Sequence, residues 1–180
     1  EHKDNVAGLD DVRAFNFIQN KTMDVYETEN VQKALQREFH YVFSGMQYPG
    51  IPKIKLHLIE GDTPFNIEGL EFRPIKVFHH KLPVLGFRIG DFTYITDANK
   101  IPDTEKWKIS GTKVLVLNAL RPRHHLSHFT LEQAVGLMEE FKPERGFFTH
   151  ISHQLGLHNE VEKCLPDFVK IAYDTLKIEI

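Results

Sequence analysis

The stretch TKVLVLNAL, residues 112–120, limits the folds open to this chain more than any other segment. It is a nearly continuous apolar run, typical of a strand that is buried on both faces. An amphipathic pattern, LEQAVGLMEEF (131–141), follows and predicts a helix, and RGFFTHI (145–151) predicts a further strand. This alternation of strand and helix predicts layered sheets flanked by helices.

Other segments give weaker patterns. Residues 1–19 are expected to form a loop that runs into a short helical or irregular stretch, and 23–26 a short strand. Thr28 is the expected N-cap of a helix over 29–43. Residues 54–96 have the pattern of β-strands, with turns at Glu68-Gly69 and at Gly90-Asp91. A helix over 156–165 and strands in the closing KIAYDTLKIEI complete the expected elements.

Composition excludes several classes of protein. The length of 180 residues suits one domain, and the net charge of -3 gives no reason to expect nucleic-acid binding. No apolar run is long enough to span a membrane, so no membrane partner is expected. The single cysteine, Cys164, excludes an internal disulfide and favours a reducing compartment, so we expect a cytoplasmic protein. The unusual count is histidine, with 11 residues.

Four short stretches gather metal-ligating residue types. They are EHKD (1–4), VFHHK (77–81), YITDA (94–98) and FFTHISH (147–153). In the last three, a strand-like run ends and a histidine or aspartate follows, so side chains from several strands could converge at one rim. Neutral imidazole and carboxylate both bind metal ions near neutral pH. Each residue alone could be an ordinary surface residue, but the set predicts a metal site.

Four motifs carry a resemblance to a known family. The motif H-x-D at 2–4, the run FHHKLPVLGFRIGDFTYITDANKIP, SHFTLEQA and FFTHISH resemble the metallo-β-lactamase fold hydrolases. They are most similar to the PhnP-type phosphodiesterase branch, near RNase Z. The resemblance implies an α/β fold, the αββα sandwich with two mixed β-sheets flanked by helices, and one hydrolase domain over 1–180. The family motif H-x-H-x-D-H would start just before Glu1, after a β-rich segment. The chain would then be the C-terminal two-thirds of such a domain, with its N-terminal part missing.

The same resemblance implies the ligands and catalytic groups. The metal ligands would be His2, Asp4, His79, Asp97 and His150, with Asp97 bridging two ions. Asp4 and His128 are the expected catalytic residues, and His128 would be a proton donor or relay rather than a ligand. Asn5 stands where the family motif has its last histidine, which would weaken the second metal position. The residues expected to contact substrate or to support the ligands are Asn5, His80, His125 and His153.

The implied reaction is hydrolysis of a small phosphodiester by a hydroxide held between two metal ions. We expect Zn²⁺, with Mn²⁺ as the alternative, at one or two ions per chain. Two other readings stay open: the same fold acting on a thioester, lactone or lactam, and a non-catalytic homologue with a weakened second site. RNA processing is disfavoured, because no long basic arm is evident. Whether the chain is a monomer or a homodimer is left open.

Overall fold

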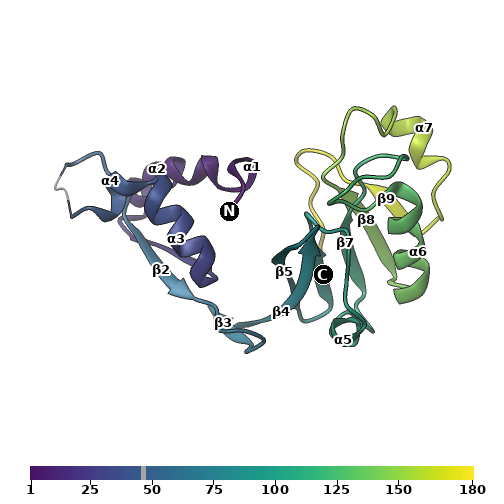
Figure 1. Cartoon of the computed structure of the whole chain (residues 1–180), viewed down its shortest axis with the longest axis horizontal. Helices are drawn as coiled ribbons and strands as arrows, with labels where there is room; N and C mark the ends of the chain where they lie inside the picture. Colours follow the sequence, from purple (N-terminus) through teal and green to yellow (C-terminus); the bar gives the residue numbers. More distant parts are fainter. Residues whose placement is uncertain (46–47) are drawn as a thin grey trace. The chain divides into compact units, whose positions relative to one another are not determined.

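The structure is a computed structural model that describes residues 1–45 and 48–180. The chain folds into two compact units, Glu1–Gly61 and Asp62–Ile180, and Figure 1 shows the elements of each. The N-terminal unit contains a two-stranded sheet with several short helices. The C-terminal unit contains a seven-stranded sheet with three helices among its described residues.

The N-terminal unit is more helical than expected over its first 19 residues. Its elements are α1 (Lys3–Val6), the 3-10 helix η1 (Ala7–Asp11), α2 (Val12–Gln19), β1 (Met23–Glu27), α3 (Glu29–Glu38), α4 (His40–Phe43) and β2 (Ile54–Leu58). Strands β1 and β2 pair in parallel. The buried Asn16 side chain ties α2 to the residues that lead into both strands, because it donates to the carbonyls of Lys21 and Lys53 and accepts from the Lys53 amide.

The helix expected over 29–43 is interrupted. Thr28 is the N-cap residue of α3, as predicted, but α3 ends at Glu38. Phe39 has φ -110° and ψ 40°, outside the helical region, and α4 begins only after it. The apolar spacing continues across the break, so the sequence pattern alone did not reveal it.

The sheet of the C-terminal unit is mixed. Its strands, in spatial order, are β3 (Phe65–Ile67), β4 (Leu70–His79), β5 (Leu82–Ile89), β6 (Phe92–Ile95), β7 (Val114–Asn118), β8 (Arg145–Thr149) and β9 (Val169–Ile171). Pairings from β3 to β6 are antiparallel, and those from β6 to β9 are parallel. Both predicted turns, at Glu68-Gly69 and Gly90-Asp91, join neighbouring strands. Since β4, β6, β7 and β8 run in the same direction, their carboxyl ends lie at one edge.

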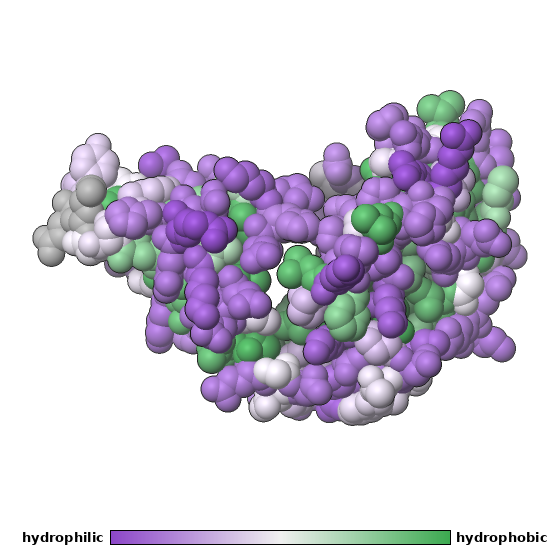
Figure 2. Space-filling view, viewed as in Figure 1, coloured by the Kyte–Doolittle hydropathy of each residue, from purple (hydrophilic) through white to green (hydrophobic). Residues whose placement is uncertain are grey.

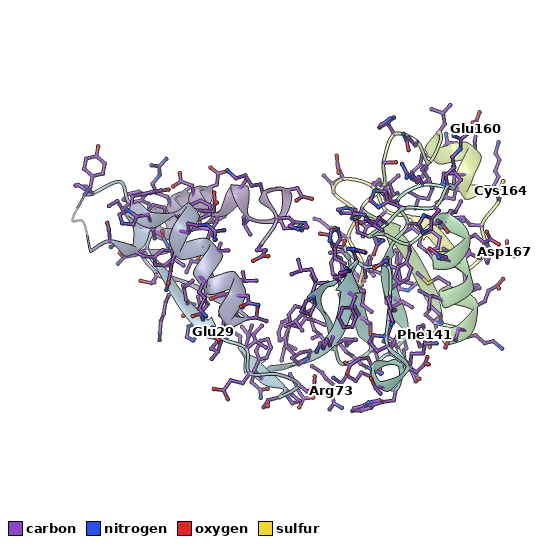
Figure 3. The ribbon with its side chains drawn as sticks, in the orientation of Figure 1. Glu29, Arg73, Phe141, Glu160, Cys164 and Asp167 are labelled. Atoms are coloured by element: carbon purple, nitrogen blue, oxygen red, sulfur yellow. The ribbon has the colours of Figure 1, made fainter. Side chains whose placement is uncertain are left out.

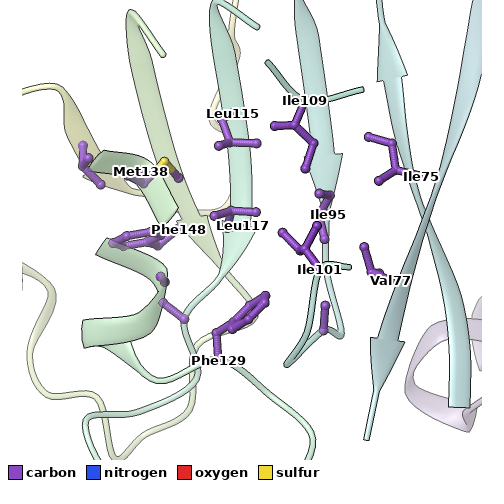
Figure 4. Close-up of a cluster of buried hydrophobic side chains, with 14 residues drawn as sticks. Ile75, Val77, Ile95, Ile101, Ile109, Leu115, Leu117, Phe129, Met138 and Phe148 are labelled. Atoms are coloured by element: carbon purple, nitrogen blue, oxygen red, sulfur yellow. The ribbon is translucent and has the colours of Figure 1, made fainter. Parts of the chain in front are cut away.

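Strand β7 is buried on both faces, which confirms the prediction from its apolar run. Leu115 and Leu117 point into the main core, where Figure 4 shows them among side chains from neighbouring strands and from α6 (Leu131–Phe141). Val114 and Val116 lie on the opposite face, in a second cluster with Phe147. Burying each such aliphatic side chain contributes about 1.5–3 kcal/mol.

The remaining helices agree with the sequence to different degrees. Helix α6 has the predicted bounds and begins with a capping box, in which Thr130 and Gln133 each bond the other's backbone amide. Helix α5 (Asp103–Lys106) follows β6, and α7 (His158–Glu162) is shorter than the expected helix over 156–165. Cys164 is exposed just beyond α7, as Figure 3 shows.

The prediction of strands throughout the closing segment is wrong beyond Ile171. Strand β9 ends at Ile171, which is paired with Phe148 of β8, and the Ala172 amide beyond it donates to the Phe148 carbonyl. Residues 172–180 form no strand, and Leu176 and Ile178 instead pack on the cluster of Val114 and Val116.

Hydrophilic residues cover most of the face seen in Figure 2, with scattered apolar side chains between them. Within residues 1–45 and 48–180, we find no helix with the length and apolar character needed to cross a bilayer.

Candidate metal centre

Three of the predicted ligands lie at the edge where parallel strand ends meet. His79 is the last residue of β4, Asp97 follows β6 after one intervening residue, and His150 comes directly after β8. The shared direction of these strands explains the convergence, because each chain leaves the sheet at the same edge. His128 reaches this edge from the segment between β7 and α6.

The side chains contact one another closely. Asp97 Oδ1 lies 2.9 Å from His128 Nε2 and 3.2 Å from His150 Nε2. The His128 ring stacks on the His150 ring with centroids 4.8 Å apart, and it meets the His79 ring edge-on at the same distance. Asp97 and His128 are each 9% exposed, so the contacts are largely shielded from solvent.

The residues present fit a divalent metal ion. Ligand atoms of His79, Asp97 and His128 all lie within 4.8 Å of one another. Zinc binds imidazole nitrogen and carboxylate oxygen at about 2.0–2.2 Å, so small side-chain movements would close such a group around one ion. Burial lowers the pKa of His128, although its hydrogen bond to Asp97 opposes this effect.

Strained backbone marks the same edge. Asp97 and His150 both have φ 54°, and His80, next to His79, has φ 57°. This left-handed conformation costs an L-residue roughly 1–2 kcal/mol, so surrounding contacts must hold it in place.

Asn118 supplies one of those contacts. Its side chain is completely buried, donates to the Ala98 carbonyl at 3.0 Å and accepts from the Ala98 amide at 2.9 Å. The carboxamide thereby fixes the peptide groups that follow Asp97. It also has both halves of its amide paired, which a fully buried asparagine requires.

A second asparagine joins the loops that carry His79 and His128. Asn99 accepts from the His80 amide at 2.8 Å and donates to the Leu126 carbonyl at 2.9 Å. The Phe129 amide also donates to the Ala98 carbonyl at 2.8 Å. The segments on either side of the cluster are therefore held to one another by backbone and amide hydrogen bonds.

Sequence reasoning did not identify Asn118 or Asn99. The sequence could have indicated the role of Asn118, since it is a polar residue inside the apolar run 112–120, and a buried amide needs hydrogen-bond partners. Asn99 left none, because an asparagine after a strand is typical of any turn.

The supporting residues expected from the sequence have different positions. His125 lies beside His128, with 2.9 Å between their Nδ1 atoms. His80 and His153 are exposed on the loops that follow His79 and His150. Arg121 joins its own loop to the loop after β8, since its guanidinium donates to the His124 carbonyl and to Gln154 Oε1.

The remaining expected ligands belong to the N-terminal unit. His2 is the N-cap residue of α1, and Asp4 and Asn5 lie within that helix, all three exposed. Their convergence with Asp97 and His150 stays a prediction, as do the ligand and catalytic roles implied by the family motif.

Comparison with known families identifies the fold. The profile described as the beta-lactamase superfamily domain matches residues 1–151, which include the four residues of the cluster. The chain belongs to the beta-lactamase superfamily. The predicted metallo-β-lactamase fold is confirmed, and the seven-stranded mixed sheet is its larger sheet in this chain.

Two solved structures are similar to this chain to different degrees. The crystal structure of a new diphosphatase from the PhnP family has a TM-score of 0.87 and 32% identity, over 97% of this chain and 66% of that one, which supports the predicted PhnP-like branch. Zn²⁺-bound PqqB from Methylobacterium extorquens has a TM-score of 0.70 at 16% identity, over 99% of this chain and 68% of that one, and shows the shared fold.

A curated relative is named after an acyl transfer and not after the hydrolysis of a phosphate compound. The protein called octanoyltransferase from Porphyromonas gingivalis is 35% identical over 178 residues, which are 98% of this chain and 36% of that protein. The chain therefore spans about a third of this relative and about two-thirds of the PhnP-family diphosphatase.

Proposed function

We propose that this chain forms the catalytic centre of a metal-dependent phosphodiesterase that acts on a small phosphodiester. The observation that carries the proposal is the cluster at the strand ends, where Asp97 contacts His128 and His150 and the His79 ring lies against His128. The similarity to a PhnP-family diphosphatase supports a phosphoryl substrate.

In this proposal Asp97, His79 and His150 hold the metal, with His2 and Asp4 as further ligands from the N-terminal unit. When bound, the metal supplies Lewis-acid polarisation of a phosphoryl oxygen and lowers the pKa of a coordinated water. Imidazole and carboxylate donors without a thiolate suit Zn²⁺ and also Mn²⁺, and we propose zinc.

The remaining roles belong to side chains of the chain itself. The Asp97 carboxylate contacts the histidines of the cluster, and the two hydrogen bonds between Asn118 and the Ala98 backbone hold Asp97 in position. His128 donates a proton to the leaving alkoxide from its Nε2 edge, which faces the cluster. The anionic phosphodiester itself favours a protonated imidazole beside it, which offsets the effect of burial on the His128 side chain.

A second candidate activity rests on the relative named octanoyltransferase, whose name implies an octanoyl acyl group. The alternative is hydrolysis of an octanoyl thioester at the same cluster. The chain spans only 36% of that relative, so the named activity could belong to either part of the longer protein. We therefore rank it second.

Both activities can be tested on one preparation. The chain, loaded with Zn²⁺ or with Mn²⁺, is assayed with bis-p-nitrophenyl phosphate and with an octanoyl thioester, and its metal content is measured. We expect phosphodiester hydrolysis, and a fall of roughly 10²–10⁴-fold in kcat for His128→Gln with metal content retained. The matched control is His40→Gln, which replaces an exposed histidine of α4 and should change neither quantity.

Three results would contradict the proposal. Faster hydrolysis of the thioester would favour the second candidate. Metal binding without hydrolysis of either substrate would favour a non-catalytic homologue. Loss of metal in His128→Gln would make His128 a ligand instead of a proton donor.

A further inference from the structure

Asn99 holds the backbone on both sides of His79. Its own amide donates to the carbonyl of Phe78 at 2.9 Å, and its side-chain Oδ1 accepts from the amide of His80 at 2.8 Å. The Phe78 amide also donates to the Lys100 carbonyl at 3.0 Å, so this part of the chain pairs with the end of β4. Asn99 therefore brackets the residue that carries the first imidazole of the cluster.

The same side chain reaches the loop that carries His128. The Nδ2 group of Asn99 donates to the carbonyl of Leu126 at 2.9 Å. On the other side of His128, the amide of Phe129 donates to the carbonyl of Ala98 at 2.8 Å. The loop of His128 is therefore bonded, before and after the histidine, to two consecutive residues of the segment that follows β6.

The two partners fix the orientation of the Asn99 carboxamide. A backbone N–H can only donate and a backbone carbonyl can only accept, so the oxygen must face His80 and the NH2 group must face Leu126. With the carboxamide turned over, two donors would meet on one side and two acceptors on the other. Each half of the carboxamide therefore holds a different loop.

We propose that Asn99 is a positioning residue that sets the spacing between His79 and His128. Its Oδ1 holds the backbone from which His79 reaches the metal, and its Nδ2 holds the backbone from which His128 reaches the substrate. The two rings meet edge-on with centroids 4.8 Å apart, so a shift of either loop changes their contact. The role at His128 rests on the proposed function, whereas the role at His79 rests on metal binding alone.

Two variants separate the two halves of the carboxamide. In Asn99→Asp, the side chain has the same shape and keeps an acceptor for the His80 amide, but it has no donor for the Leu126 carbonyl. Asn99→Ala removes both hydrogen bonds. The matched controls are Asn66→Asp and Asn66→Ala, which make the same changes at an exposed asparagine of β3.

The first measurement needs no metal. Hydrogen exchange of backbone amides is followed by NMR in the full chain, freed of metal by chelation. We expect the His80 amide to exchange roughly fivefold faster in Asn99→Ala than in the parent, and no faster in Asn99→Asp. The Phe129 amide, which bonds the Ala98 carbonyl, should stay protected in both variants and so show that the fold is intact. Unchanged exchange of the His80 amide in Asn99→Ala would overturn the proposal.

The second measurement combines Zn²⁺ affinity, from competition with a chelator, with phosphodiester turnover by the loaded chains. Asn99→Ala should bind Zn²⁺ roughly 10–100-fold more weakly than the parent, whereas Asn99→Asp should bind it at least as tightly. In Asn99→Asp we expect kcat to fall roughly 10–100-fold with KM unchanged, because only the loop of His128 is released. Parent-like affinity in Asn99→Ala, or parent-like kcat in Asn99→Asp, would overturn the proposal.

The outcomes also separate this proposal from the proposed function. A parent that binds Zn²⁺ but does not hydrolyse the phosphodiester would overturn the proposed function, and the Zn²⁺ affinities of the two variants would still decide the role of Asn99 at His79. Weaker Zn²⁺ binding in Asn99→Asp would show that the bond to Leu126 supports the metal, and would overturn the assignment of separate tasks to the two halves of the carboxamide.

Discussion

Aspartate suits position 97 both for its backbone conformation and for the contacts of its side chain. Its backbone has φ 54°, a conformation that aspartate and asparagine tolerate better than most other residues, because their short side chains can bond locally. Its carboxylate meanwhile contacts His128 and His150. His150 has the same φ, which histidine also adopts more often than most residues do, and the contacts around it hold that conformation in place.

Glu27 is a buried carboxylate outside the cluster. It is 6% exposed, and neither of its oxygens makes a hydrogen bond of ordinary geometry within residues 1–45 and 48–180. Burial raises the pKa of Glu27 from 4.5 to about 7, and the nearby Gln32 side chain offsets only part of this rise. The unfolded chain therefore releases this proton at a lower pH than the folded chain does.

We expect the free energy of unfolding to fall between about pH 4.5 and pH 7, the interval between the unfolded and folded pKa values of Glu27. The full contribution is present below pH 4.5, and up to about 3 kcal/mol of it is lost by pH 8. Glu27→Gln, which stays neutral, should remove this part of the pH dependence and be more stable than the parent at pH 8.

Urea unfolding of parent and variant at pH 4 and pH 8 measures the effect. The exposed Glu60→Gln is the control and should leave the difference between the two pH values unchanged. Equal stability of Glu27→Gln and the parent at pH 8 would show that Glu27 is not buried as a charge.

At the scale of elements, the close contact between β5 and β6 requires a glycine at position 86, because glycine has no side chain. A Cβ built on Gly86 would lie 2.5 Å from Ile95 Cγ1 and 3.0 Å from the Tyr94 carbonyl oxygen. Ile95 is completely buried in the main core and cannot move aside. Strand β6 leads directly to Asp97, so this contact also bears on the cluster.

We predict that Gly86→Ala destabilises the chain by about 1–3 kcal/mol, the typical cost of overpacking a core. Gly136→Ala is the matched control, since it lies in α6 and a Cβ there would meet nothing within 4 Å. Alanine in a helix interior should stabilise it by about 0.5–1 kcal/mol. Urea unfolding of both variants tests the pair, and a neutral Gly86→Ala would mean that β5 and β6 can separate without cost.

At the scale of the whole molecule, metal binding should stabilise the fold. A ligand that binds only the folded state at 100 times its Kd adds about 2.7 kcal/mol. We expect Zn²⁺ to raise the Tm of the chain, and Asp97→Asn to abolish most of that rise. Asparagine tolerates φ 54° and keeps the size of the side chain, so the variant removes mainly the charge.

Thermal unfolding with and without Zn²⁺ measures both chains. Asp103→Asn, at an exposed aspartate in the first turn of α5, should respond to Zn²⁺ as the parent does. A rise in Tm of the same size in Asp97→Asn would place the metal elsewhere and contradict the assignment of the cluster.

The agreement between sequence and structure is uneven for physical reasons. Helix α6 and the turns at Glu68-Gly69 and Gly90-Asp91 follow local rules of spacing and backbone conformation, so the sequence predicts them well. The break at Phe39 and the absence of strand after Ile171 depend on what each segment packs against. Apolar periodicity does not contain that information.

For the site, the sequence alone placed metal-ligating residue types at the ends of strand-like runs, and the family resemblance then singled out His79, Asp97 and His150 as ligands to be tested. Only the tertiary structure decided that His128 lies between Asp97 and His125, and that Asn118 and Asn99 fix the loops around them. These strand ends lie at the same edge because β4, β6, β7 and β8 run in the same direction within one sheet. Hydrogen bonds between loops distant in sequence, in contrast, arise only once the sheet has brought those loops together.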